Sequence, residues 1–283
     1  MPEILPSDGE SLRLEANGVT LHAVAAGLAD GPLVILLHGF PEFWYGWRRQ
    51  IAPLAASGLR MVAPDQRGYN LSDKLAGIAA YRLDTLADDV LGLADALGRE
   101  RFAVVGHDWG AAVAWHVASG NPERVTRAAI LNAPHPATLR QYARVHVRQA
   151  LKSWYVAYFQ LPRLPELGLR AAGFRGLRRA LQRTSRPGTF TDEDFRHYRE
   201  AWAQPGALTA MLNWYRALRL PGGLRAPVRV RVPVRVIWAT RTPFSKAASP
   251  KPPPRSAIGR RCSTCPALPI GCSTRKRTRS IGG

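Results

Sequence analysis

One stretch, residues 103–118 (AVVGHDWGAAVAWHVA), constrains the fold more than any other part of the chain. It begins as an apolar, β-rich run, passes through a short polar turn, and continues as an alanine-rich segment that favours a helix. Asp108 stands at the point of the turn, between Gly106 and Gly110. Glycine suits positions where a sharply bent backbone passes close to neighbouring elements, because a β-carbon would collide with them. The pattern therefore predicts a strand, a tight turn that presents Asp108, and a helix.

Apolar runs alternate with helix-like stretches before and after this turn. The chain begins with a hairpin pattern whose turn is Asn17-Gly18. The alternation that follows predicts a parallel, doubly wound sheet, and the ligand of such a sheet binds at the carboxyl ends of its strands. The polar residues gather at those expected ends: His38 to Phe40, Asp65 to Gly68, Asp108, and Asn132 to His135.

Changes in residue composition and apolar pattern divide the chain into four parts. Residues 1–136 are expected to form the first part of an α/β core, and residues 137–222, rich in arginine and aromatic residues, a helical cap. Residues 223–240 resume the core with one strand. Residues 241–283 are a basic tail rich in Pro, Ser and Arg. Such a composition buries too little apolar surface to offset its ordering entropy, so we expect the tail to be disordered.

Composition excludes several classes of protein. The net charge is +20, but ten Lys or Arg and no acid lie in residues 241–283, so half of the net charge is in the tail. We therefore expect no nucleic-acid partner. No apolar run reaches the length of a membrane span, and the acidic start lacks the features of a signal peptide, which predicts a cytoplasmic protein without a membrane partner. All three cysteines lie in the tail without a nearby histidine, so we expect neither a disulfide framework nor a metal site.

Four segments taken together resemble the epoxide hydrolase branch of the α/β-hydrolases: HGFPEFWYGWRRQI (38–51), DQRGYNLSDK (65–74), GHDWGAAVAW (106–115) and LNAPHP (131–136). In the cap, YFQLP (158–162) and NWYR (213–216) resemble the places where that family carries two ring-opening tyrosines. The resemblance implies the α/β-hydrolase fold with a helical cap, hydrolysis of an ether bond, a small apolar epoxide and water as substrates, and no cofactor.

The resemblance also implies roles for individual residues. Asp108 would be the nucleophile, since a carboxylate is ionised at neutral pH and can attack a saturated carbon to form an alkyl-enzyme ester. The backbone N–H groups of Phe40 and Trp109 would form the oxyanion hole. The side chains of these two residues and of Phe43 would line an apolar pocket. The other interpretation of Asp108 is a simple helix cap.

Two cap tyrosines are implied as proton donors to the opening epoxide. These are Tyr158 and Tyr215, and Tyr155 is the main competitor for the role of Tyr158. For each tyrosine the alternative is ordinary aromatic packing with a satisfied hydroxyl.

The acid and the histidine that complete the family's triad are missing from their expected places. Thr242 stands where an aspartate is expected, no histidine follows His197, and no Asp or Glu follows Glu200. Asn132 occupies the alternative place for the acid. We hypothesise that the sequence leaves its ancestral reading frame shortly after Thr240, so that the last strand and helix of the fold are also lost. Little steady-state hydrolysis and a trapped ester are then expected.

Three other functions remain open at this point. A haloalkane or haloacid dehalogenase would use the same aspartate, and a non-catalytic homologue would bind ligands without reacting. The third is binding of nucleic acid or acidic lipid by the basic tail, residues 241–283.

Overall fold

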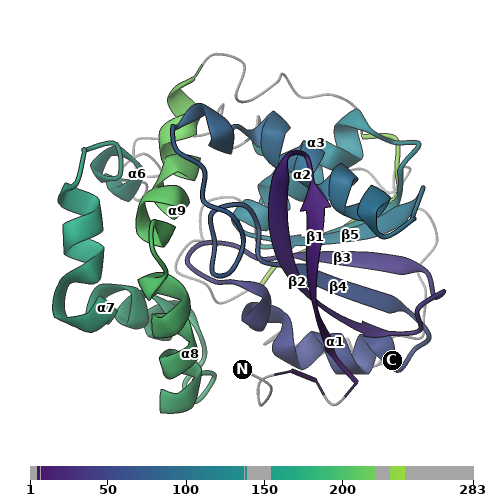
Figure 1. Cartoon of the computed structure of the whole chain (residues 1–283), viewed down its shortest axis with the longest axis horizontal. Coiled ribbons are helices and arrows are strands. Elements are labelled where there is room, and N and C mark those ends of the chain that lie inside the picture. The colour runs from purple at the N-terminus through teal and green to yellow at the C-terminus, as the bar shows by residue number, and fades with distance from the viewer. Residues whose placement is uncertain (1–4, 7, 137, 139–153, 221–229, 240–283) are drawn as a thin grey trace, which may run out of the picture.

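The computed structural model describes residues 5–6, 8–136, 138, 154–220 and 230–239 (Figure 1). Within these residues the core is a seven-stranded sheet in the order β1-β2-β4-β3-β5-β6-β7. The strands are β1 (Glu10–Ala16), β2 (Val19–Gly27), β3 (Leu33–Leu37), β4 (Arg60–Pro64), β5 (Phe102–His107), β6 (Val125–Leu131) and β7 (Val234–Ile237).

The sheet is antiparallel at one edge and parallel elsewhere. β1 pairs with β2, and β2 pairs with β4, in antiparallel register, whereas β4, β3, β5, β6 and β7 run parallel. The β1–β2 turn has positive φ at Asn17 (49°) and Gly18 (73°), as a two-residue hairpin turn of type I′ requires. The hairpin predicted from Asn17-Gly18 is confirmed.

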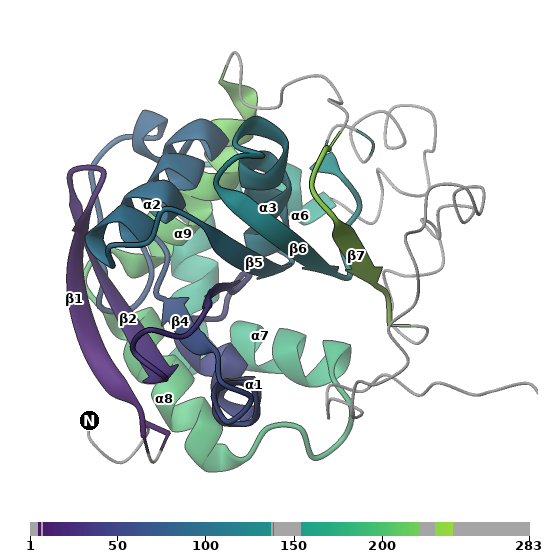
Figure 2. The same cartoon turned by 90° about the vertical axis from the view of Figure 1, so that its right-hand side faces the viewer.

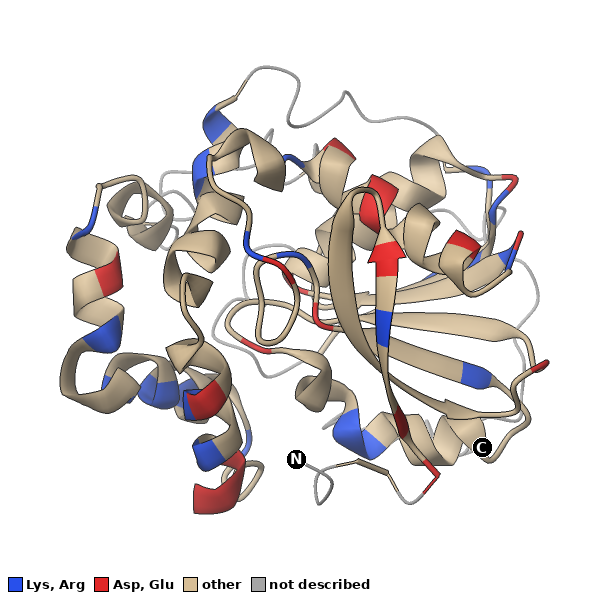
Figure 3. Ribbon diagram, viewed as in Figure 1, with Lys and Arg blue, Asp and Glu red and all other residues tan. Residues whose placement is uncertain are grey.

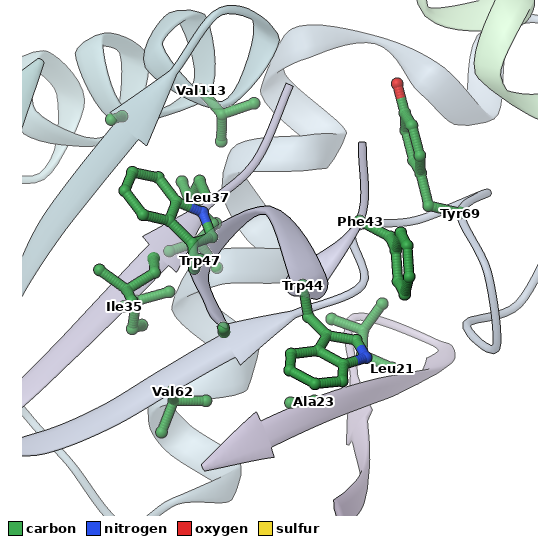
Figure 4. Close-up of a cluster of buried hydrophobic side chains, with 14 of the residues drawn as sticks. Leu21, Ala23, Ile35, Leu37, Phe43, Trp44, Trp47, Val62, Tyr69 and Val113 are labelled. Atoms are coloured by element: carbon green, nitrogen blue, oxygen red, sulfur yellow. The ribbon is translucent and has the colours of Figure 1, made fainter. Parts of the chain in front are cut away.

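Helices cover both faces of the sheet (Figure 2). α1 (Arg48–Ala55) packs on β2 and β4, while α2 (Leu83–Ala96) and α3 (Trp109–Gly120) lie together on the opposite face. Buried aliphatic residues of β2, β3 and β4 meet the aromatic side chains of the β3–α1 segment in the core (Figure 4). The predicted doubly wound α/β architecture is confirmed.

Helices α6 to α9 lie between β6 and β7 in sequence and stand together at one end of the sheet (Figure 1). They are α6 (Trp154–Tyr158), α7 (Leu164–Thr184), α8 (Asp192–Ala203) and α9 (Ala207–Arg216). α8 begins with a capping box, in which Thr191 and Asp194 bond each other's backbone N–H. We refer to these four helices as the cap helices.

α7 contains an interruption that no proline marks in the sequence. Ala172, Gly173 and Phe174 adopt left-handed dihedral angles, with φ of 49°, 65° and 63°. A left-handed conformation costs about 1–2 kcal/mol per non-glycine residue. Burial of the Phe174 ring, 5.9 Å from the ring of Trp202, contributes in the opposite direction.

Some predictions fall outside the described residues. These are the disorder of residues 241–283 and the loss of a final strand and helix. Among the described helices, none is both long and apolar enough to cross a membrane.

Candidate active site

The turn between β5 and α3 is strained and tightly packed. Asp108 has φ 53° and ψ −118°, a region that non-glycine residues rarely adopt. A β-carbon on Gly106 would overlap the backbone of Gly110, and a β-carbon on Gly110 would overlap the carbonyl group of Leu37. The two glycines thus allow the sharp bend that exposes the Asp108 side chain.

The loop after β3 holds the carboxylate of Asp108. Its Oδ1 accepts a hydrogen bond from the Phe40 backbone N–H at 3.0 Å. Gly39 allows this approach, because a β-carbon there would lie 2.7 Å from the same oxygen. The Asp108 side chain makes no capping hydrogen bond to α3, so the helix-cap interpretation is wrong. Its carboxylate is exposed and held by one backbone donor.

Two cap tyrosines interact electrostatically with this carboxylate. Burial, and then the charge of Asp108, raise the pKa of Tyr155 to about 12. Burial and the Asp108 charge also raise the pKa of Tyr215 well above its ordinary value. The two rings meet edge to face at 6.0 Å, and the ring of Tyr215 lies 5.0 Å from that of Trp109. Both phenols therefore stay protonated at neutral pH beside Asp108.

The structure does not bring Tyr158 to this point. Its hydroxyl donates to the carbonyl oxygen of Leu164 at 3.2 Å, beside Gly168. Tyr155 and Tyr158 belong to one short helix but direct their hydroxyls to different surroundings. Of the two tyrosines, Tyr155 is the one whose ring meets that of Tyr215, at 6.0 Å.

Phe40 and Trp109 lie together against the aromatic cluster of the cap, but Phe43 does not join them. Phe43 is buried against Tyr45 (5.7 Å) and Tyr198 (5.3 Å) between the core and α8. Its side chain is only 4% exposed and belongs to the hydrophobic core. The structure thus assigns Phe43 to packing and leaves Phe40 and Trp109 beside the nucleophile.

Tyr215 is held in place by its two neighbours in the NWYR motif. The indole N–H of Trp214 donates to the carbonyl oxygen of Arg67 at 3.0 Å. The Arg216 guanidinium bonds Glu166 at 2.8 Å and the carbonyl oxygen of Phe159 at 3.0 Å. The motif thereby ties α9 to the core on one side and to α6 and α7 on the other.

Sequence reasoning missed Tyr69, which lies in the DQRGY segment. Its ring is 1 % exposed and meets the rings of His38 and Trp214 edge to face. Its buried hydroxyl has no hydrogen-bond partner among the described residues and points away from the apolar cluster (Figure 4). Burial and the charge of Asp108 raise its pKa well above the ordinary value. A tyrosine inside a loop motif carries no sequence signal for such a position.

The histidines near the turn bond the loops around it. His38 bonds the carbonyl oxygen of Gly39 and accepts the backbone N–H of Gln66. His107 lies 3.5 Å from the carboxylate of Glu42. Burial lowers the pKa of His107, but the hydrogen bond and charge of Glu42, with the charge of Asp108, raise it overall.

Asp65 and Arg67 are structural, and each has its own partners. Asp65 is fully buried and bonds His22 and Asn70, whereas Arg67 forms a buried ion pair with Asp89 at 2.6 Å. At the end of β6, Asn132 Oδ1 accepts the backbone N–H of Ala239. The described residues contain no group of three or more potential metal ligands.

Comparisons with known proteins agree on the family. The model of the alpha/beta hydrolase fold family matches residues 32–249. AB hydrolase superfamily protein YfhM of Bacillus subtilis is 56% identical over 206 residues, 73% of this chain and 72% of that protein. Epoxide hydrolase 4 of Mus musculus is 39% identical over 72% of this chain, which spans only 58% of that relative. The crystal structure of Bacillus megaterium epoxide hydrolase with an inhibitor has a TM-score of 0.74 and 32% identity, covering 82% of this chain and 84% of that one.

Proposed function

The chain belongs to the alpha/beta hydrolase fold family and is epoxide hydrolase-like, and from this premise we propose that Asp108 opens an epoxide by forming an alkyl-enzyme ester. One observation carries the proposal: Asp108 accepts a hydrogen bond from the Phe40 backbone N–H, and the ring of Tyr215 packs on Phe40 and Trp109 and meets the ring of Tyr155. The core thus supplies the nucleophile and the cap supplies the proton donors that ring opening needs.

The first step balances with these groups alone. A carboxylate oxygen of Asp108 bonds to an epoxide carbon, the carbon–oxygen bond breaks, and the resulting alkoxide takes a proton from Tyr155 or Tyr215. Burial is the main cause of the raised pKa of both phenols and the Asp108 charge is the second; the ester that forms is neutral, so this second contribution disappears. Ring opening thereby makes the phenols more acidic as one of them gives up its proton, which solvent then restores.

The second step would release a diol. Water adds to the ester carbonyl, and the backbone N–H groups of Phe40 and Trp109 would stabilise the oxyanion. A base must accept the proton of that water, but no histidine follows His197 in these 283 residues. His38 and His107 are engaged with backbone groups and Glu42. We therefore propose that the ester forms and is released slowly.

Intact-mass analysis after incubation with styrene oxide tests the proposal. We expect one adduct, mapped to Asp108, which persists after the free epoxide is removed and is absent from Asp108→Asn. No adduct together with saturable binding would support a non-catalytic homologue. Rapid, repeated diol formation would contradict the slow release.

Incubation with haloalkanes distinguishes an epoxide hydrolase from a dehalogenase. A departing halide takes no proton, whereas the alkoxide of an opened epoxide needs one, and this difference favours the epoxide for the pair Tyr155 and Tyr215. We expect the epoxide to alkylate Asp108 much faster than a haloalkane of the same size, and halide release at the faster rate would reverse the assignment.

The nucleotide sequence around codons 238–246 tests the frameshift hypothesis, which fails if no other frame encodes an Asp, a strand and a His.

A further inference from the structure

The interruption of α7 leaves a hollow on the cap. Ala172 and Gly173 turn the chain there, and Phe174 inserts inward toward Trp202. On the other side of this turn a hollow of about 200 Å³ is lined by Ala172, Gly173, Arg175, Arg178, Phe195 and Arg199. Its walls come from the interrupted part of α7 and from α8.

Three of the lining side chains are arginines, and only one of them is paired with an acid. Arg178 bonds Asp192 at 2.6 Å and lies over the ring of Phe195, 4.7 Å from its centroid. Arg175 and Arg199 are exposed and make no ion pair or hydrogen bond within the described residues. Arginine positions recur along α7 and α8 (Figure 3). Three positively charged side chains therefore line the hollow, and one of them is paired with an acid, Asp192, which is not part of the lining.

The other acids of the cap helices are engaged elsewhere. Glu193 and Glu200 pair with Arg196, Asp194 with Arg48, and Glu166 with Arg216. None of them forms an ion pair with Arg175 or Arg199. The positive charge of these two arginines is therefore not compensated by an acid in the described part of the chain. Arg178 is already held in one orientation by Asp192 and the Phe195 ring, so ordering it around a ligand costs little entropy.

We propose that this hollow binds an oxyanion of the phosphomonoester class. Guanidinium groups match phosphate oxygens with paired N–H donors, and groups from two helices can approach a tetrahedral dianion from different sides. The volume accommodates a phosphoryl group and a few atoms of its ester. The apolar ring of Phe195 forms part of the wall beside those atoms.

This site is separate from Asp108 but shares a helix with the contacts between cap and core. α8 places Phe195 and Arg199 at the hollow, while Asp194, Tyr198 and Trp202 bond Tyr45, Glu42 and Pro41 of the core. The proposal does not depend on the reaction at Asp108.

Calorimetric titration of the whole chain with inorganic phosphate and phenyl phosphate tests the site. We expect saturable binding at one site, weakened by about tenfold or more in Arg175→Ala and in Arg199→Ala, and lost in the double variant. Arg196→Ala is the matched control, because Arg196 is exposed on the same helix and pairs with Glu193 and Glu200; it should bind like wild type.

Three results would overturn the proposal. Phosphate binding that is unchanged in Arg175→Ala/Arg199→Ala would place the anion elsewhere, including on the basic tail. Absence of saturable binding would show that the arginines are only solvated. Benzoate binding as tightly as phenyl phosphate would assign the hollow to carboxylates. Circular dichroism and the melting temperature of each variant confirm that these exposed substitutions leave the fold intact.

Discussion

The core half and the cap half of the site are built by different physical means. In the core half, backbone atoms fix the geometry: Gly39, Gly106 and Gly110 allow close approaches, and Asp108 is held at φ 53°. In the cap half, packed side chains fix it, through the edge-to-face rings of Tyr155 and Tyr215 and the hydrogen bonds of Arg216. Backbone constraints leave glycine signatures in the sequence, whereas packing leaves only aromatic residues whose orientation is open.

The largest expected effect is on the rate of Asp108 alkylation in Tyr→Phe variants of the cap, and it distinguishes the roles of the three tyrosines. Tyr155→Phe and Tyr215→Phe should each slow alkylation of Asp108 by styrene oxide about 10²-fold or more, because each removes a proton donor. Tyr158→Phe is the matched control on the same helix and should stay within about twofold, since its hydroxyl bonds the carbonyl of Leu164. Adduct formation is followed by mass spectrometry. An equal loss in Tyr158→Phe would return the role to Tyr158.

Gly39→Ala tests the core half. The new β-carbon would overlap the side chain of Asp108 and displace the carboxylate from the Phe40 N–H. We expect alkylation to slow about 10²-fold, as small misplacements of reacting groups can do. Gly120→Ala, at the end of α3 with open space around it, should react like wild type. Normal alkylation in Gly39→Ala would show that the loop after β3 does not position the nucleophile.

Arg216→Met tests whether side-chain bonds hold the cap half together. The substitution leaves Glu166 without its cation and removes the bond to the Phe159 carbonyl. We expect the free energy of unfolding to fall by about 2 kcal/mol, measured by urea denaturation. Arg219→Ala, at an exposed position just beyond α9, serves as the comparison. Equal stability of the two variants would mean that ring packing alone positions Tyr215.

The smallest expected effect is a pH dependence beside the nucleophile. Burial lowers the pKa of His107, but the hydrogen bond and the charge of Glu42 outweigh burial, so the pKa is raised in the folded state. Its pairing with Glu42 therefore stabilises the fold fully below the ordinary histidine pKa of about 6.5, and this stabilisation is lost as pH rises through the raised pKa. Glu42→Gln should lower the melting temperature more at pH 6 than at pH 9. The part that remains at pH 9 reflects the weakened bond to Tyr198. A difference independent of pH would show that His107 is neutral throughout.

Much of the core was predictable because each feature has a local cause. Asn17-Gly18 predicts the hairpin, and alternating apolar runs and helical periods predict the parallel sheet. The glycines around Asp108 predict the strained turn. The partners of Asp65 and Arg67 were not predictable, because His22 and Asp89 come from distant elements that only the folded sheet brings near.

The cap shows where prediction from sequence stops. Tyr155 and Tyr158 are three residues apart on one helix, and periodicity cannot decide which hydroxyl turns toward Asp108. No proline marks the interruption of α7 in the sequence. The interruption brings the ring of Phe174 against Trp202, a residue of another helix. The same interruption opens the arginine-lined hollow, which no motif marks.

The sequence by itself determined the α/β core, the position of Asp108 at the point of its turn, and the absence of a histidine after His197. These depend on local backbone requirements and on residue identity. Only the tertiary structure decided that Tyr155 accompanies Tyr215, that Phe43 packs between core and cap, and that three arginines share one hollow. Those results depend on contacts between residues far apart in the chain, whose free energies are set only when the helices pack against the sheet.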